Sequence, residues 1–220
     1  MTETTALVLF GDVIGSTKDR VAATAWLRDV VARLDDIYGE RKLAPFGFTQ
    51  GDELQGLLAP DADPMAAVLH AALGQGARPI RWVCVKGLVD PGEGPATQRT
   101  GQAFLAARDA IGEARTLREQ LVIRTGDARA DALLADMAPA LVELLNGLTS
   151  RQREVARLAL IDGLRQSAVA DRLKVRRATI SVAFARAKVH PIERLARAIG
   201  QVYAGTVTTL AAESDDGRGS

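Results

Sequence analysis

The sequence has very little cysteine and histidine. Among its 220 residues there are one cysteine, Cys84, and two histidines, His70 and His190. A single cysteine excludes a disulfide within the chain, and so few thiol and imidazole groups argue against a zinc site. Cys84 lies in an apolar run, so we expect it to be a core residue in a protein of a reducing compartment.

The sequence also lacks membrane-spanning and targeting signals. The first residues, Met1 to Thr5, contain no basic side chain, and no stretch approaches the length of a membrane span. Hydrophobic residues make up 47% of the chain and charged residues 25%, which is typical of globular proteins. We therefore expect a cytoplasmic protein without membrane contact, with one large or two modest hydrophobic cores.

The chain as a whole has almost no net charge, but one segment is strongly basic. The formal net charge is +1, yet residues 149–200 carry 12 Lys and Arg against 4 Asp and Glu. Residues 1–148 carry 15 Lys and Arg against 20 Asp and Glu. This division predicts a small module that binds a polyanion, joined to a mildly acidic domain.

Two acidic turns follow apolar runs in the first 58 residues. The run from Ala6 to Phe10 is typical of a buried strand and ends at Gly11-Asp12. The segment 46–58 predicts a hairpin with Asp52 and Glu53 at its tip. If the strands are neighbours, the carboxylates of Asp12, Asp52 and Glu53 converge. Their repulsion requires a cation, and carboxylate oxygens are ligands that Mg²⁺ accepts, so we predict a magnesium site.

These turns resemble those of known enzymes. Residues 11–17 resemble the first metal-binding turn of class III nucleotidyl cyclases, and Gly51-Asp52-Glu53-Leu54 resembles their second turn and the GGDEF signature of diguanylate cyclases. The resemblance implies a ferredoxin-like palm domain in which Asp12 and Asp52 bind metal ions. It also implies that backbone amides after Asp12 bind the phosphates of a nucleotide. Those amides belong to Val13, Ile14, Gly15, Ser16 and Thr17. The two turns and the overall architecture are similar to the SatD family.

The chain departs from the cyclase pattern at two positions. Arg108 lies where cyclases carry an arginine that contacts phosphate, but the asparagine expected four residues earlier is Phe104. Phe48 replaces a lysine that selects the base. These differences argue against catalysis and leave phosphate binding intact.

The remaining pattern predicts an α+β fold, with a ferredoxin-like domain over residues 1–147 and an all-α domain over 148–211. The helices are expected over 21–38, 64–74, from 101 onward and over 128–147, and the strands over 80–89 and, as a short edge strand, 118–124. The last of these helices carries a broad apolar stripe, expected to be core or a dimer seam. The polar residues 212–220 are predicted to be disordered.

Residues 163–187 have the pattern of a helix-turn-helix. Small Ala170 allows two helices to approach closely, and five apolar residues supply a core: Val169, Leu173, Val175, Ile180 and Phe184. The pattern resembles sigma-factor region 4 and the output domains of response regulators. It departs from them at Lys174, where a glycine usually makes the turn, so a left-handed backbone is expected there at some cost.

The second helix of such a motif enters the major groove of double-stranded DNA. We expect its first residues to lie at base edges: Arg176, Arg177, Thr179 and Ser181. Three others are expected to contact phosphates: Arg165, Gln166 and Arg186. A trihelical domain that binds protein is the alternative, and the local charge of +8 over residues 149–200 favours DNA.

Three functions are consistent with this sequence. The first is a transcription regulator, homodimeric through a helix predicted over 192–211, whose cyclase-like domain senses a nucleotide and Mg²⁺ without catalysis. The second is an active nucleotidyl cyclase that carries a DNA-binding domain. The third is a DNA-binding protein whose palm domain serves dimerisation alone.

Overall fold

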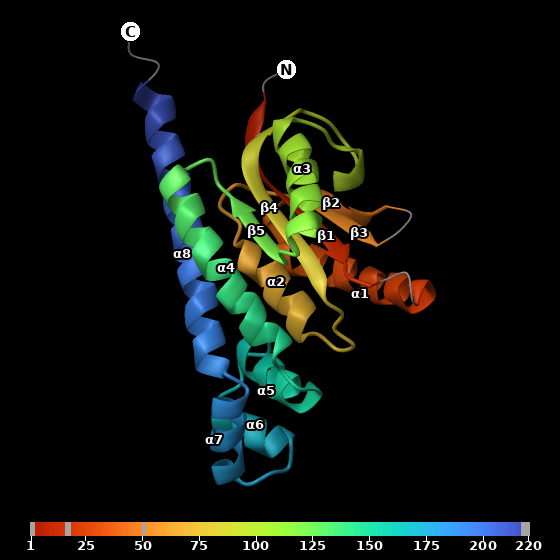
Figure 1. Ribbon diagram of the computed structural model, residues 1–220, viewed down its shortest axis with the longest axis vertical. Coiled ribbons are helices and arrows are strands. Elements are labelled where there is room, and N and C mark those ends of the chain that lie inside the picture. The colour runs from red at the N-terminus through yellow and green to blue at the C-terminus, as the bar shows by residue number, and fades with distance from the viewer. Residues whose placement is uncertain (1–2, 16–18, 50–51, 217–220) are drawn as a thin grey trace.

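A five-stranded sheet forms the centre of the computed structural model, which describes residues 3–15, 19–49 and 52–216 (Figure 1). The strand order across the sheet is β2-β3-β1-β4-β5. The strands are β1 (Thr4–Val13), β2 (Lys42–Phe48), β3 (Glu53–Leu58), β4 (Ile80–Val89) and β5 (Leu121–Arg124). β1 pairs antiparallel with both β3 and β4, and β5 joins the edge parallel to β4. β2 and β3 form the predicted hairpin.

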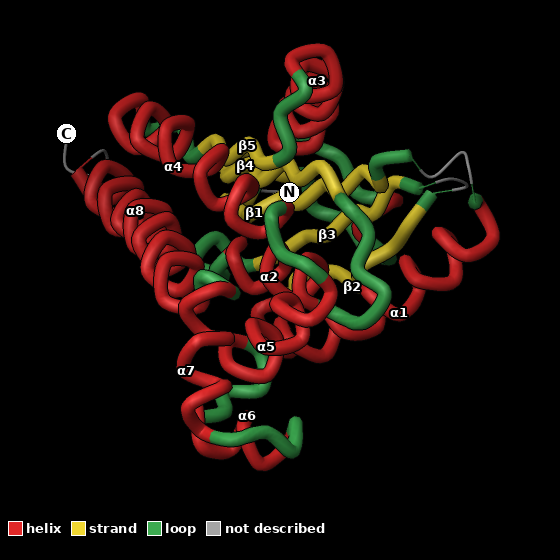
Figure 2. The backbone as a smooth tube through the Cα atoms, turned by 60° about the horizontal axis from the view of Figure 1, so that its bottom comes forward, coloured by secondary structure: helices red, strands yellow, loops and turns green. Residues whose placement is uncertain are grey.

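Helices cover both faces of this sheet (Figure 2). α1 (Arg20–Tyr38) and α2 (Pro64–Leu73) pack on one face, and α3 (Gln102–Leu117) packs on the other. From β1 to β4 the elements follow the order strand, helix, strand, strand, helix, strand, which is that of the ferredoxin-like motif. The predicted mixed α and β fold is therefore confirmed.

The apolar run of β1 is buried on both sides, which explains why it lacks alternation. Leu7 and Leu9 contribute to the core under α1 and α2, whereas Val8 and Phe10 contribute to the core under α3. Phe10 and Phe104 of α3 lie with ring centroids 6.1 Å apart. Successive side chains of a strand point to opposite faces, so a strand between two helical layers is apolar throughout.

Helix starts follow the capping residues in the sequence. Asp63 accepts from the Met65 amide at 2.9 Å at the start of α2. Asp127 accepts from the amides of Arg129 and Ala130 at the start of α4 (Ala128–Asn146). Thr149 and Gln152 form a capping box at the start of α5 (Ser150–Leu160). Each cap satisfies amides that have no partner inside the helix.

The predicted helix-turn-helix is present as α6 (Gln166–Arg172) and α7 (Arg177–Arg186), packed against α5. Val169, Ala170, Ile180 and Phe184 are buried between these helices. Lys174 in the turn has φ 53°, the left-handed backbone expected there. Lys188, just after α7, has the same φ, so strained lysines flank α7 at both ends.

The last helix differs most from its predicted bounds. α8 (Val189–Asp216) begins three residues before the predicted helix and continues into the segment predicted to be disordered. Pro191 is tolerated because it lies in the first turn, where its missing amide is not needed. The rest of the predicted tail, residues 217–220, lies outside the described residues.

The long α8 runs back along the sheet beside α4 (Figure 1). The Tyr203 hydroxyl donates to the Pro60 carbonyl at 2.9 Å, and the buried Lys86 of β4 donates to Thr206. One hydrophobic cluster extends from β1 through α2 and α4 to α7 and α8. The predicted division at residue 147 therefore does not coincide with a gap in the core, and it stays a prediction.

In the described part of the chain no single helix is long and apolar enough to cross a membrane. α4 and α5 meet that test only when taken together, and they are bent by 119° at their junction.

Candidate functional site

The two acidic turns meet at one end of the sheet, as predicted. β1 and β3 are antiparallel neighbours in a register that places Asp12 opposite Glu53. The Val13 amide donates to the Asp52 carbonyl at 3.0 Å, which joins the first turn to the second. Residues 40 positions apart therefore share one site because the hairpin returns beside β1.

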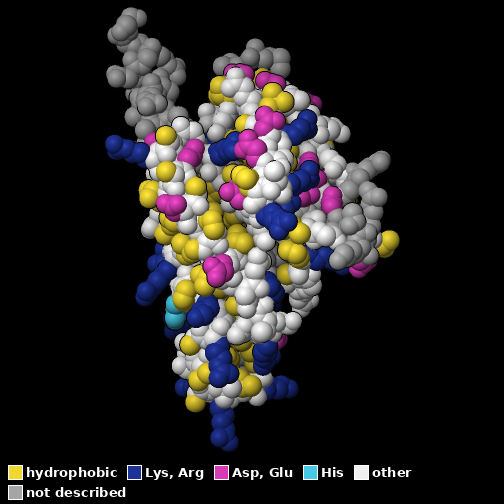
Figure 3. All heavy atoms as spheres, in the orientation of Figure 1, with side chains coloured by type: hydrophobic (Ala, Val, Ile, Leu, Met, Phe, Trp, Pro, Cys, Tyr) yellow, Lys and Arg dark blue, Asp and Glu magenta, His cyan; other side chains and the backbone are white. Residues whose placement is uncertain are grey.

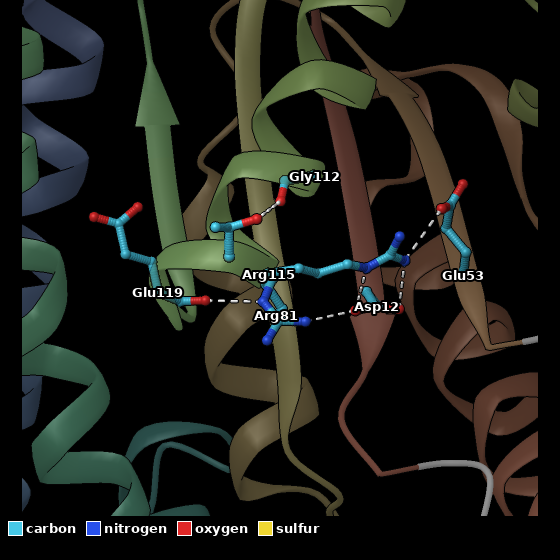
Figure 4. Close-up of polar contacts among 7 residues, drawn as sticks. Asp12, Glu53, Arg81, Gly112, Arg115 and Glu119 are labelled. Atoms are coloured by element: carbon cyan, nitrogen blue, oxygen red, sulfur yellow. Dashed lines mark hydrogen bonds and ion pairs between the residues drawn. The ribbon is translucent and has the colours of Figure 1, made fainter.

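Two arginines surround the Asp12 carboxylate (Figure 4). Nη1 of Arg81, in β4, donates to Oδ2 at 2.6 Å. Arg115, in the last turns of α3, donates from Nε to Oδ2 at 3.1 Å and from Nη2 to Oδ1 at 2.8 Å. Nη2 of Arg115 also lies 3.8 Å from Oε2 of Glu53. We call Asp12, Glu53, Arg81 and Arg115 the acid–arginine cluster.

Burial makes these contacts strong. Asp12 is only 7% exposed, and a carboxylate that leaves water needs charged partners. The hydrogen bond to Asp12 raises the pKa of Arg115 above its ordinary value, with further contributions from Glu53 and Asp52. Arg81 is held in place because its Nε donates to the Glu119 carbonyl at 2.9 Å. The Gln55 amide donates to Glu53 at 2.9 Å.

This arrangement does not fit a metal ion as it stands. Both oxygens of Asp12 already accept hydrogen bonds from guanidinium groups, which supply the positive charge that the sequence led us to expect from Mg²⁺. Among the described residues no three acidic, histidine or cysteine side chains are placed to hold a metal ion. Magnesium binding by Asp12, Asp52 and Glu53 stays a prediction, and it requires the arginines to move.

The predicted phosphate-binding turn is only partly described. The Val13 amide is bonded to the Asp52 carbonyl, and the Ile14 amide donates to the Pro79 carbonyl at 2.9 Å. These two amides would have to leave their partners to bind a phosphate. Gly15 has φ 76°, as its place in a tight turn requires. Ser16 and Thr17 lie outside the described residues.

Arg115 is the arginine of α3 that contacts the acidic end of the sheet, and the phosphate contact of Arg108 stays a prediction. Arg108 is exposed, whereas Arg115, seven residues later, reaches Asp12. Those seven residues correspond to about 10 Å along a helix. Phe104 is a core residue, 4% exposed, and Phe48 packs at the edge of the other core. Only the strand register and the length of α3 could have identified Arg81 and Arg115.

The residues predicted to bind DNA lie together on the helix-turn-helix, and all are exposed. They are Arg165, Gln166, Arg176, Arg177, Thr179, Ser181 and Arg186. Arg176 and Arg177 stand at the start of α7, and Arg186 stands at its end. Figure 3 shows basic side chains projecting from this end of the molecule. Val169, Ala170, Ile180 and Phe184 of the same helices are buried, whereas Val182 of α7 is 51% exposed among the basic residues.

No protein-family model and no curated protein matches the chain. The resemblance to the SatD family therefore stays a prediction. The solved structures that it resembles include a bacterial light-regulated adenylyl cyclase, with 13% identity and a TM-score of 0.42 over 56% of this chain and 77% of the other. A second structure of such a cyclase gives 12% identity and a TM-score of 0.38 over 56% of this chain and 43% of the other.

Another similar structure is that of a regulator of polyketide synthase expression from Bifidobacterium adolescentis. It has 16% identity and a TM-score of 0.28, covering 91% of this chain and 82% of the other. These values are low, so the interpretation of the fold rests on strand order and register.

Proposed function

We propose that this protein is a DNA-binding transcription regulator with a cyclase-like palm domain that does not catalyse nucleotide cyclisation. The observation that carries the proposal is the surface formed by α6, the turn and α7, where seven exposed polar and basic side chains gather. α7 acts as the recognition helix in the major groove of double-stranded DNA, with Arg176 and Arg177 at base edges. Two copies bind two half-sites, as helix-turn-helix proteins commonly do.

The acid–arginine cluster supports the absence of catalysis. A two-metal reaction needs carboxylates that are open to metal ions, and here three guanidinium hydrogen bonds engage Asp12. Phe104, in place of the asparagine, is part of the core and offers no polar atom to a substrate. Guanidinium groups bind phosphate as well as carboxylate, so the palm domain is proposed to sense a nucleotide or another phosphorylated ligand.

Fluorescence anisotropy with randomised double-stranded DNA tests the proposal. The wild-type protein should bind, and its affinity should fall steeply as the salt concentration rises. The double change Arg176→Ala and Arg177→Ala should abolish most binding. Arg28→Ala, which removes an exposed arginine from α1, is the matched control and should bind as the wild type does. Binding that the double change leaves intact would refute the assignment of α7.

The alternative is an active cyclase. Incubation with each nucleoside triphosphate and Mg²⁺, followed by chromatography of the products, separates the two functions. No product is expected. A cyclic or linear product formed by the wild type and lost in Asp12→Asn would establish the enzyme and overturn the sensor proposal.

A further inference from the structure

A cavity of about 390 Å³ lies between the palm sheet and the first helix of the DNA-binding unit. Its walls come from α2, the loop before β4, β4 and β5, α4, and α5. We infer that this cavity is an effector site for a small organic anion with an apolar body. The site is separate from the acid–arginine cluster, and its regulatory role rests on the proposed function.

The body of the cavity is apolar. Trp82 offers an aromatic surface, and Val142 and Leu145 of α4 lie among the apolar residues that line the cavity with it. Ligand sites commonly combine such walls with a few polar groups, in volumes of about 300 to 1,000 Å³. The volume is at the small end of that range, which favours a compact aromatic molecule over a nucleoside triphosphate.

The polar groups of the cavity favour an anion. Among the described residues that line it are two arginines, Arg78 and Arg153, and no acidic residue. Arg78 has a carboxylate partner in Asp19, at 3.1 Å. Arg153 instead donates to two backbone carbonyls, those of Ala72 and Leu145. Carbonyl oxygens carry only partial charge, so the Arg153 guanidinium remains positive and well placed to bind an anion.

Burial adds to this preference. Partial removal of Arg153 from water lowers its pKa, because desolvation disfavours the charged form. A bound carboxylate or sulfonate would supply the missing counter-charge. Asn146 donates to Gln120 at 2.9 Å, and both amides line the cavity, where they offer further hydrogen bonds to a ligand.

The position of Arg153 links the cavity to the DNA-binding unit. The residue belongs to α5, while its two carbonyl partners lie in α2 and α4. α5 packs against α6 and α7. A ligand that draws the guanidinium into the cavity therefore competes with the bonds that fix α5 against α2 and α4. This competition gives the ligand different affinities for different placements of α7, as an effector requires.

Anilinonaphthalene sulfonate is a suitable probe, because it joins an aromatic body to one sulfonate. The Trp26→Phe variant leaves Trp82 as the single tryptophan, so quenching of its emission reports on the cavity. We expect saturable binding of one probe per chain. The neutral analogue phenylnaphthylamine, which lacks the sulfonate, should bind at least tenfold more weakly.

Arg153→Gln in this background should weaken probe binding about ten- to hundredfold, the usual effect of losing a hydrogen bond to a charged group. Arg151→Gln removes an exposed arginine of the same helix, paired with Glu154, and is the matched control. Because Arg153→Gln could impair folding, Val142→Phe provides a second variant that fills part of the cavity, leaves Arg153 in place and adds no tryptophan. It should also prevent binding.

Equal affinity for the charged and neutral probes, or unchanged binding by both Arg153→Gln and Val142→Phe, would overturn the site. DNA anisotropy with the same samples separates this outcome from failure of the proposed function. If the protein binds DNA but not the probe, only the proposed cavity site is overturned. If it binds the probe but not DNA, the proposed effector role is overturned. If the probe saturates the cavity and leaves DNA affinity unchanged, the effector role is likewise overturned.

Discussion

The acid–arginine cluster and the surface of α7 are both rich in arginine, yet the two regions use it in opposite ways. At the cluster, Arg81 and Arg115 are committed to Asp12 through three hydrogen bonds. On the helix-turn-helix, Arg176 and Arg177 are exposed at the start of a helix. Both regions contain arginine, so the residue type alone does not decide whether the side chain stabilises the fold or is available to a ligand. What decides it is the partner that the fold places beside each arginine.

The difference follows from the elements that carry each residue. β4 lies beside β1 with Arg81 opposite Asp12, so the sheet register itself delivers a counter-charge. α7 packs against α5 and α6 and buries Ile180 and Phe184, which leaves its basic residues on the outside. We therefore expect substitutions at the cluster to act on stability, and substitutions on α7 to act on DNA binding.

Asp12→Ala should have the largest effect on stability. It removes the carboxylate that Arg81 and Arg115 share and leaves two cations together, at a cost of about 3 kcal/mol in the free energy of unfolding. Urea denaturation followed by circular dichroism measures this loss. Asp109→Ala, an exposed acidic residue of α3, serves as the control and should cost little. A stable Asp12→Ala protein would show that the cluster does not support the fold.

On the helix-turn-helix, Arg177→Ala should leave the free energy of unfolding unchanged and weaken DNA binding. A lost bidentate contact to guanine costs about 1 to 3 kcal/mol and relaxes specificity at one base pair. Arg186→Ala should weaken binding to all sequences alike and reduce the salt dependence, as loss of a phosphate contact does. Anisotropy with a panel of duplexes distinguishes the two. Identical effects of both changes on every duplex would contradict the predicted division of roles.

Lys174→Gly tests the turn between α6 and α7. Glycine adopts the left-handed backbone without the penalty that lysine has, so the variant should gain about 0.5 to 1 kcal/mol in stability. Thermal denaturation detects the gain. Gly163→Ala provides the converse, because Gly163 has φ 66° and alanine should destabilise the protein there. A loss of stability in Lys174→Gly would mean that the lysine makes a compensating contact.

The smallest expected effect concerns His70 of α2. Burial and the nearby Arg33 lower the pKa of His70, and Asp162 opposes them. The unfolded chain therefore binds more protons between the lowered folded pKa and about 6.5, so stability falls as the pH drops through that window. His70→Gln should flatten this part of a stability–pH curve, which urea denaturation at a series of pH values measures. Equal slopes of stability against pH in the wild type and in His70→Gln would contradict the assignment of this pH dependence to His70.

The sequence alone predicted most of the elements, because their signals are local. The apolar run of β1 and the helix-turn-helix pattern each depend on a few neighbouring residues. The meeting of Asp12 and Glu53 also followed from the predicted hairpin.

What sequence could not provide was long-range placement. Arg81 and Arg115 lie 69 and 103 residues from Asp12, and only the register of β4 and the length of α3 bring them together. The cavity beside Arg153 likewise depends on how α5 packs against α2 and α4. The extent of the core is a third long-range property, because one hydrophobic cluster joins residues on both sides of position 147.

The 28-residue α8 also sets a mechanical limit. At about 1.5 Å per residue it spans about 42 Å, and an α-helix resists stretching far more than it resists bending. Because α8 adjoins α7 at one end and is fixed to the sheet through Tyr203 and Thr206, it acts as a strut of constant length. The helix-turn-helix can therefore tilt or roll relative to the sheet, but it cannot move away from it.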